Sequence, residues 1–291
     1  MSTVRTVLRQ LEGKLAVVTG ASRGIGAAIA RDLGAKGANI LAVYTSESST
    51  KLANDLSAEL KSEHGVVVAI CKADLNDPEK ASAEIANAAK AAFSDENGNL
   101  KIDILVNNAG VGGDYKLGSV PVSEFHRIYA VNVLAPICVT QALLPFLLTD
   151  RSGRIVNISS VASSMGFATH TLYGGTKAAL EAMTRTWARE LAERATVTAV
   201  NPGPVEGDMY FAAGEKFWKQ MEPFQLNCPL SAVRDGVDDP ALVKLATEKM
   251  GGRRPAYWRE VAAVVGMLCG PDSAWCTGSV ICANGGFRFQ T

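Results

Sequence analysis

The sequence lacks the features that mark a protein for a membrane or a charged polymer. Its 291 residues contain 29 basic and 29 acidic side chains, and this balance excludes a general attraction to nucleic acid or to anionic lipid. No apolar run approaches the roughly 18 residues of a bilayer span, and residues 1–14 lack the apolar centre of a signal peptide. We therefore expect a cytoplasmic protein whose partner is a small molecule, with no nucleic acid and no membrane.

Cysteine and histidine are few and do not have metal-binding spacing. The six cysteines show no CxxC pair and lie mostly in apolar stretches: Cys71, Cys138, Cys228, Cys269, Cys276 and Cys282. We interpret them as reduced core residues, and we predict neither a disulfide framework nor a metal site. Of the three histidines, His170 alone lies near the reactive residues described below, where it could touch substrate, although a surface role is more usual.

Strand-like and helix-like segments alternate along the chain, with no linker, internal repeat or low-complexity stretch between them. Hydrophobic residues make up 47% of the sequence and charged residues 20%, values typical of a globule with a large core. Seven segments are predicted strands: 14–20, 38–44, 66–74, 101–110, 153–160, 196–203 and 278–286. The alternation predicts one α/β domain over residues 1–291, with a seven-stranded, doubly wound parallel sheet covered by helices on both faces.

Unusual residues follow the predicted strands, at the sheet edge where ligands bind in such folds. They are a glycine turn at 19–26, Tyr44, Asp74, NNAG at 107–110, NISS at 157–160 and NPGP at 201–204. The glycine turn reads TGASRGIG. Glycines there let backbone amides approach a pyrophosphate, and the following helix adds the positive end of its dipole. The alternative is a tight turn with no ligand.

Four motifs together resemble the short-chain dehydrogenase/reductase family over nearly the whole chain. They are TGASRGIG, NNAG, YGGTK at 173–177 and NPGPV at 201–205. The resemblance implies a Rossmann fold and a nicotinamide cofactor. It implies that the cofactor is held by Gly20, Ser22, Arg23, Gly24, Ile25, Gly26, Tyr44, Thr45, Ser46, Asp74, Leu75, Asn108, Ala109, Gly110, Tyr173, Lys177, Pro202, Gly203 and Val205. Asp74 resembles the family's adenine-binding acid, and its alternative role is to cap a loop.

The residues after the second predicted strand favour NADP(H) over NAD(H). An acid at that position would bind the ribose hydroxyls and repel a 2′-phosphate, but this chain has Tyr44. Thr45 and Ser46 offer hydroxyls, and Arg23 can approach the same phosphate. A guanidinium about 4 Å from a phosphate charge gains about 4 kcal/mol at an effective dielectric of 20, before desolvation. Glu47 is the one nearby carboxylate that opposes this interpretation.

Tyr173 and Lys177 are four residues apart in a helix-like segment, which places both side chains on one helix face. A neighbouring ammonium stabilises a phenolate, and at about 5 Å we expect it to lower the pKa of Tyr173 by roughly two units. Taken alone, such a pair is usually an exposed tyrosine and lysine. The resemblance adds Ser160, thirteen residues upstream, as the serine that orients the carbonyl, and this favours Ser160 over Ser159.

Asn132 lies in a long helix-like stretch, four residues before Pro136. Because proline has no N–H, the carbonyl of Asn132 loses its helical partner and becomes able to hold water. The resemblance implies that this water connects Lys177 to solvent, whereas the alternative is a solvated kink. Catalysis is thus assigned to Ser160, Tyr173, Lys177 and Asn132.

Residues 204–255 form an irregular section that the resemblance identifies as a substrate lid. Its apolar residues predict a bulky ketone, aromatic or aliphatic, as substrate, contacted by Met209, Tyr210, Phe211 and Trp218 together with Ser160 and Tyr173. The alternative is a lid that packs on itself or on another subunit. Gly207 stands where the family often has a threonine that contacts the nicotinamide carboxamide, which puts that contact in doubt.

The sequence therefore predicts an NADPH-dependent carbonyl reductase acting on a small to medium hydrophobic ketone. One alternative is a reductase of 3-oxoacyl groups on an acyl carrier protein, for which Lys216, Lys219, Arg253 and Arg254 form too small a basic patch to decide. Another is a non-catalytic protein that senses NADP(H). The resemblance also implies a homo-oligomer, a tetramer or dimer built on the helices near 125–149 and 171–195.

Overall fold

A computed structural model describes residues 9–289 except residue 213, and it contains one seven-stranded parallel sheet. The strands are β1 Leu15–Thr19, β2 Asn39–Tyr44, β3 Val68–Lys72, β4 Ile104–Asn107, β5 Gly153–Ile158, β6 Ala195–Val200 and β7 Val280–Ile281. Each lies within, or one residue from, a predicted segment, so the predicted doubly wound fold is confirmed. The strand order is β3-β2-β1-β4-β5-β6-β7, so the direction of winding reverses between β1 and β4. A crevice for ligands is expected at their carboxyl ends.

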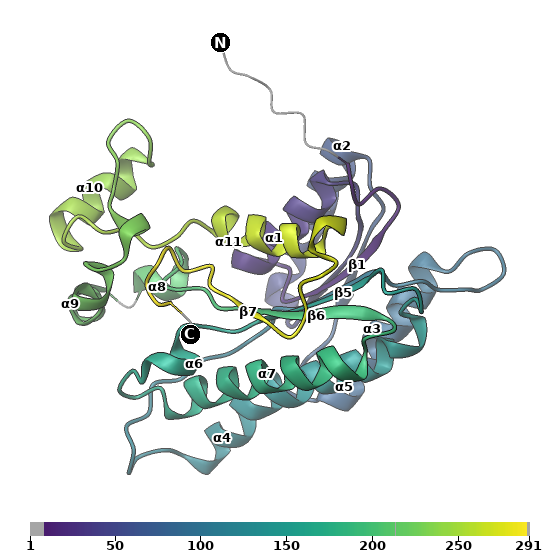
Figure 1. Cartoon of the computed structure of the whole chain (residues 1–291), viewed down its shortest axis with the longest axis horizontal. Coiled ribbons are helices and arrows are strands. Elements are labelled where there is room, and N and C mark those ends of the chain that lie inside the picture. The colour runs from purple at the N-terminus through teal and green to yellow at the C-terminus, as the bar shows by residue number, and fades with distance from the viewer. Residues whose placement is uncertain (1–8, 213, 290–291) are drawn as a thin grey trace.

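Helices cover both faces of the sheet (Figure 1). One face carries α1 Gly24–Ala35, α2 Thr50–His64 and α11 Trp258–Cys269; the other carries α3 Pro78–Phe93, α5 Ala135–Leu143 and α7 Thr171–Glu190, with α4 Val122–Tyr129 leading into α5. The remaining short elements are α6 Ala162–Met165, a π-helical turn at Ala130–Leu134, and 3-10 turns at Glu47–Ser49, Leu144–Phe146, Pro229–Ser231 and Pro271–Ser273. Asp77 caps α3 by accepting a hydrogen bond from the Lys80 amide at 3.3 Å, and Pro78 occupies the first helical position, where its missing N–H costs nothing.

The strands divide the core into two layers because successive side chains point to opposite faces. On β1, Ala16 and Val18 pack beneath α1 and α11, whereas Leu15 and Val17 pack toward α3 and α5. Strands that are buried on both faces have nearly continuous apolar sequences, and for this reason they can be recognised in the sequence.

The helical stretch Val122–Phe146 corrects the expectation that no segment is long and apolar enough to cross a membrane. It has 25 residues and a mean hydropathy of 1.6, and 44% of its apolar window is buried in the protein. Length and composition alone are weak evidence for a span. The hydrophobic character has a local explanation, because Val131, Val139 and Leu143 pack in the core beneath the sheet.

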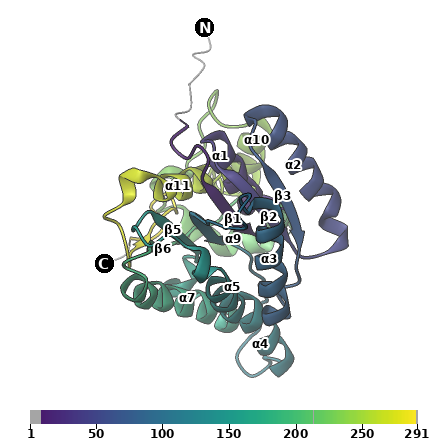
Figure 2. The ribbon, with the colours of Figure 1, turned by 90° about the vertical axis from the view of Figure 1, so that its right-hand side faces the viewer.

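Residues 204–255 form three helices beside the sheet: α8 Asp208–Ala212, α9 Gly214–Gln225 and α10 Pro240–Lys249. Figure 1 shows α9 and α10 away from the sheet, beyond the carboxyl ends of its strands, and Figure 2 shows α9 behind the sheet when the molecule is turned. This segment has its own small core of Tyr210, Trp218, Ala246 and Met250.

Candidate active site

The glycine turn lies between β1 and α1, and two of its three glycines leave no room for a side chain. Gly20 has φ of 66°, and a Cβ there would lie 3.0 Å from the Cα of Ala109. A Cβ on Gly26 would lie 2.2 Å from the carbonyl oxygen of Gly20, so α1 can approach the turn only with glycine at this position.

Asn108 fixes the turn from the neighbouring strand. Its side-chain amide donates to the carbonyl oxygens of Thr19 at 2.8 Å and Gly20 at 3.2 Å, while the Thr19 hydroxyl accepts from the amides of Asn108 and Ala109. The side-chain amide nitrogen of Asn108 is therefore already used in hydrogen bonds within the protein. The NNAG segment would contact a ligand mainly through its backbone.

The amino end of α1 suits an anion. Arg23 is the N-cap residue, but its side chain makes no capping bond, and the first turn of α1 has no acidic residue. The Arg23 side chain is exposed and makes no hydrogen bond or ion pair with any residue that the structure describes. Ser22 and Ile25 flank it and are partly exposed. An uncapped helix start beside a free guanidinium favours a phosphate group.

The residues after β2 provide hydroxyls and little net negative charge. Tyr44 is buried and its hydroxyl accepts from Thr50 at 3.3 Å, while Thr45 and Ser46 are exposed. Glu47, which opposed the NADP(H) interpretation, forms an ion pair with Lys72 at 2.7 Å, and this hydrogen bond lowers the pKa of the Glu47 carboxyl. The carboxylate is thus offset by a cation from β3.

Asp74 follows β3 and does cap its loop. One carboxylate oxygen accepts from the Asn76 backbone amide at 3.0 Å and from its side-chain amide at 2.8 Å. The other oxygen has no hydrogen bond within residues 9–289 as described, and Asp74 is exposed. Leu75 beside it is buried at 4% exposure. The capping role and a ligand-binding role are compatible, because they use different oxygens.

Tyr173, Lys177 and Ser160 are brought together at the carboxyl end of β5. The Ser160 hydroxyl is close enough to the Tyr173 phenol to act on its pKa, and the Lys177 ammonium lies 5.7 Å from the centre of the Tyr173 ring. Lys177 is 3% exposed and donates to the carbonyl oxygen of Ile158 at 2.7 Å. One turn of α7 separates the tyrosine from the lysine, as their spacing predicts.

The predicted lowering of the Tyr173 pKa by Lys177 is wrong for this structure. Burial raises the pKa of Tyr173, and the Ser160 hydrogen bond only partly opposes the rise. Burial also lowers the pKa of Lys177 to about 8. The sequence argument considered only the distance between the two groups, and it did not include the desolvation that burial imposes on both. At neutral pH the phenol is protonated and most Lys177 side chains carry their charge.

Ser159 and Ser160 point to different partners. The Ser159 hydroxyl is buried and donates to Glu181 at 2.7 Å, whereas Ser160 accepts from the Ala162 amide at 3.1 Å and meets Tyr173. The choice of Ser160 over Ser159 therefore agrees with the geometry.

Asn132 lies within the π-helical turn Ala130–Leu134, a distortion frequent at functional sites. Its side chain accepts from the Val111 amide at 2.8 Å and donates to the Thr176 hydroxyl at 3.0 Å, which ties α4 and α5 to α7. A Cβ on Gly110 would lie 3.3 Å from the Lys177 ammonium and 3.4 Å from the Asn132 carboxamide oxygen. Lys177 and Asn132 thus face the same narrow space beside NNAG.

The NPGPV segment crosses the same edge of the sheet. The Pro202 carbonyl oxygen accepts from the Val161 amide at 3.0 Å, and a Cβ on Gly203 would lie 3.3 Å from the Cβ of Asn284. Val205 pairs with Ala256 in an isolated bridge that connects the segment to the start of α11.

The predicted substrate residues of the lid mostly face its own core. Trp218 is 6% exposed and donates to the carbonyl oxygen of Tyr210 at 3.0 Å, and Tyr210 is itself 7% exposed and bonded to Gln225. These two predictions are corrected: both side chains hold α8 and α9 together. Phe211 is 37% exposed and packs edge-on against Tyr210. The side chain of Met209 lies outside the described residues.

A different set of rings connects Tyr173 to the lid. The His170 ring centre is 5.9 Å from that of Tyr173 and 5.7 Å from that of Phe167. Phe167 in turn contacts Phe224 at 5.3 Å and Phe287 at 6.3 Å. Phe167 and Phe287 were missed because they come from loops about 120 residues apart, and only the fold brings them together.

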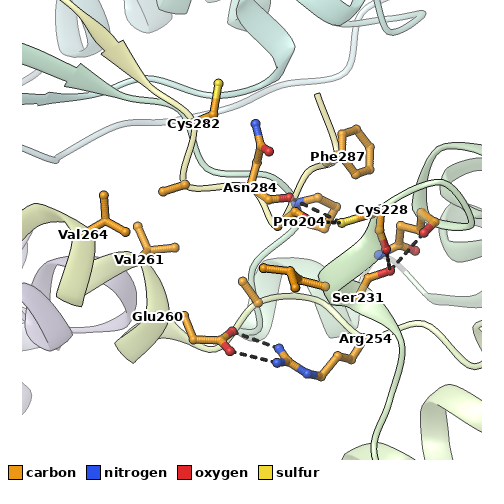
Figure 3. A pocket seen from close by; sticks show the side chains of 15 residues that line it. Pro204, Cys228, Ser231, Arg254, Glu260, Val261, Val264, Cys282, Asn284 and Phe287 are labelled. Carbon is orange, nitrogen blue, oxygen red and sulfur yellow. Dashed lines mark hydrogen bonds and ion pairs between the residues drawn. The ribbon is translucent and has the colours of Figure 1, made fainter. Parts of the chain in front are cut away.

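A cavity of about 380 Å³ lies between residues 225–231, the start of α11 and residues 282–287 (Figure 3). Figure 3 shows the Arg254–Glu260 ion pair beneath it, with donor–acceptor distances of 2.8 and 2.9 Å. Ser160, Tyr173 and Lys177 are not among the residues that line it. Cys282 lines this cavity and is exposed, which corrects the prediction that it is a core residue.

Comparison with known proteins identifies the family. Residues 14–216 match the model of the short chain dehydrogenases. The chain belongs to the short-chain dehydrogenase family. It is thus an oxidoreductase that interconverts carbonyl and hydroxyl groups, and its Rossmann-type fold agrees with that assignment.

Two curated relatives match almost from end to end. An L-xylulose reductase of Aspergillus niger is 54% identical, with 97% of this chain and 99% of the relative covered. An L-xylo-3-hexulose reductase of Hypocrea jecorina is 51% identical with the same coverage.

Among solved structures, a blue fluorescent protein from a metagenomic library in complex with NADPH is 35% identical, with a TM-score of 0.78 and coverage of 96% of this chain and 100% of that one. The angucycline C-6 ketoreductase LanV with bound NADP is 29% identical, with a TM-score of 0.80 and coverage of 96% of each chain.

Proposed function

We propose that the protein is an NADPH-dependent reductase of open-chain ketoses with the xylo configuration. The observation that carries the proposal is the convergence of Ser160, Tyr173 and the buried Lys177 ammonium at the same sheet edge as the glycine turn. The substrate class is supported by the two relatives above 50% identity, both named as reductases of such ketoses.

The residues at the sheet edge suit NADP(H). The uncapped start of α1 and its glycines would receive the pyrophosphate, and Arg23, Thr45 and Ser46 would receive the 2′-phosphate. When bound, the nicotinamide supplies a hydride to the carbonyl carbon. The relatives solved with NADPH or NADP support the same cofactor.

The side chains around Tyr173 would then handle the proton and the oxygen. Ser160 donates a hydrogen bond to the substrate carbonyl oxygen and holds it near the phenol. Tyr173 transfers its proton to that oxygen as negative charge develops. Burial raises the pKa of Tyr173, so the phenol holds the proton that reduction requires. The Lys177 ammonium stabilises the phenolate left behind, and Asn132 holds the water through which a proton returns to Tyr173.

Polar groups around His170, whose ring packs against that of Tyr173, suit the hydroxyls of a ketose. Asp114 lies 3.7 Å from the His170 ring nitrogen and accepts from the Thr169 hydroxyl at 3.4 Å. These groups are partly or fully exposed, so a polyhydroxy substrate can replace their water with hydrogen bonds. The test is NADPH oxidation by the purified protein with L-xylulose, with NADH as the competing cofactor. Turnover that needs NADPH is expected, and no oxidation of either cofactor by any ketose would refute the proposal.

A second candidate substrate is an aromatic ketone. The ring cluster of Phe167, Phe224 and Phe287 next to His170 favours it, because such a wall can stack on a planar ligand. LanV, which is named as an angucycline ketoreductase, also supports it. Comparing kcat/KM for L-xylulose with that for a bicyclic aromatic ketone decides between the two.

We further propose a homo-oligomer assembled through α4, α5 and α7. Large apolar side chains are exposed on this helical layer: Val122 at 70%, Phe125 at 41% and Leu134 at 46%. Light scattering of the purified protein tests this, and a monomer at micromolar concentration would contradict it.

A further inference from the structure

Trp258 is the first residue of α11 and is attached to the NPGPVEG segment. Its backbone amide donates to the Glu206 carboxylate at 3.0 Å. Next to it, Ala256 donates its amide to the Pro204 carbonyl oxygen and accepts from the Glu206 amide, each at 2.9 Å. These hydrogen bonds hold the start of α11 against residues 204–206.

The indole of Trp258 lies between two glycines at the sheet edge. Its Nε1 is 3.9 Å from the point where a Cβ on Gly24 would stand, and 3.3 Å from the corresponding point on Gly207. Gly24 belongs to the pyrophosphate turn and has no other heavy atom within 4 Å of that point. Gly207 has φ of 140°, a conformation that resists any side chain, and the ring occupies the space where one would project.

The indole N–H is a donor with no acceptor in the part of the chain that the structure describes. Trp258 is half-buried, and its indole nitrogen remains accessible to solvent, so this donor is open to a ligand that reaches the sheet edge. Trp218 differs, because its buried indole N–H is already used and donates to the Tyr210 carbonyl oxygen at 3.0 Å. The Trp258 donor lies beside the glycine turn, where the uncapped start of α1 and Arg23 are also placed to bind an anion.

We propose that Trp258 donates its indole N–H to an oxygen on the nicotinamide half of bound NADP(H), supplying from α11 the polar contact that Gly207 cannot make. This inference rests on the proposed function, since it needs the dinucleotide to lie along the glycine turn. In this arrangement Trp258 binds the nicotinamide half of the dinucleotide, and Arg23, Tyr44 and Asp74 bind the adenosine half.

Replacement of the donor alone tests the proposal. Trp258→Phe keeps a ring between Gly24 and Gly207 but removes the N–H, and Trp275→Phe is the matched control because Trp275 is fully exposed. Calorimetric titrations measure the Kd for NADP⁺ and for 2′,5′-ADP, which contains the adenosine half only. We expect Trp258→Phe to weaken NADP⁺ binding by about three- to tenfold, the usual effect of losing one hydrogen bond. Its Kd for 2′,5′-ADP should match that of the wild type.

A second variant reaches the same contact from the other side. Gly207→Ala places a Cβ against the indole and displaces it, so it should weaken NADP⁺ and spare 2′,5′-ADP. An unchanged Kd for NADP⁺ in Trp258→Phe overturns the inference, and so does an equal loss for both ligands, which would mean that Trp258 acts through the fold. If the wild type binds neither ligand, the proposed function fails as well, so the two failures are distinguishable.

Discussion

The carboxyl edge of the sheet and the segment 204–255 differ in what positions their side chains. At the sheet edge, Ser160 follows a buried strand and Tyr173 lies one helical turn from Lys177, so regular backbone fixes each neighbour. In the segment 204–255, aromatic residues lie on short helices whose packing partners come from α10. Spacing therefore predicts contacts in the first region but not in the second, where an apolar side chain can turn toward substrate or inward.

The largest expected effect separates two tyrosines, one from each region. Tyr173→Phe removes the proton donor and should lower kcat/KM by about 10³-fold or more while leaving the Kd for NADP⁺ unchanged. Tyr210→Phe removes a hydroxyl that accepts from Gln225 within the lid core and should leave kcat within about twofold. Steady-state kinetics and cofactor titration measure both. A Tyr173→Phe enzyme with near-normal turnover would show that Tyr173 is not the proton donor.

The next effect concerns the stability of the segment 204–255. Trp218→Ala empties a site at which the indole is 6% exposed, and it leaves the Tyr210 carbonyl oxygen without its donor. We expect a loss of about 3 kcal/mol in the free energy of unfolding, measured with urea. Phe211→Ala, at a ring that is 37% exposed, is the control and should cost well under half as much. Equal losses would mean that Trp218 is not a core residue.

The sequence predicted the sheet, the glycine turn between β1 and α1, and the proximity of Tyr173 to Lys177, because strands buried on both faces and four-residue helical spacing leave clear patterns. It did not predict that Tyr210 and Trp218 would be core residues, because α10 supplies their partners from about 30 residues away. Nor did it predict the ring cluster of Phe167 and Phe287, since tertiary packing alone joins two loops. The pKa of Tyr173 was misjudged because burial depends on the whole fold.

A smaller effect tests the cost of burying Lys177. Its pKa is about 8 in the native protein against 10.5 for a free lysine, so the unfolded chain binds the proton more tightly. That shift destabilises the fold below pH 8, and stability recovers as pH rises from 8 to about 10.5. Lys177→Met should abolish most activity yet raise the free energy of unfolding at pH 7 by about 1 to 3 kcal/mol. Urea unfolding at several pH values should show this gain shrinking toward pH 10.5; a wild type more stable than the variant at pH 7 would contradict it.

The smallest effect concerns substrate choice. Phe167→Ala removes the ring that joins His170 to Phe224 and Phe287, so KM for an aromatic ketone should rise by about fivefold. KM for L-xylulose should change less, because the polar groups around His170 remain. Phe211→Ala again provides the control from the segment 204–255. Equal changes in KM for both substrates would show that the cluster supports the loop and does not select the substrate.

A crystal structure of the protein with NADP⁺ and a ketose is the most direct test of the account. It should show the pyrophosphate at the start of α1 and the nicotinamide ring against Ser160 and Tyr173, with the ketose carbonyl oxygen within hydrogen-bonding distance of both hydroxyls. A dinucleotide bound away from the glycine turn, or a Tyr173 hydroxyl directed away from the ketose, would contradict the assignment of Tyr173 as the proton donor.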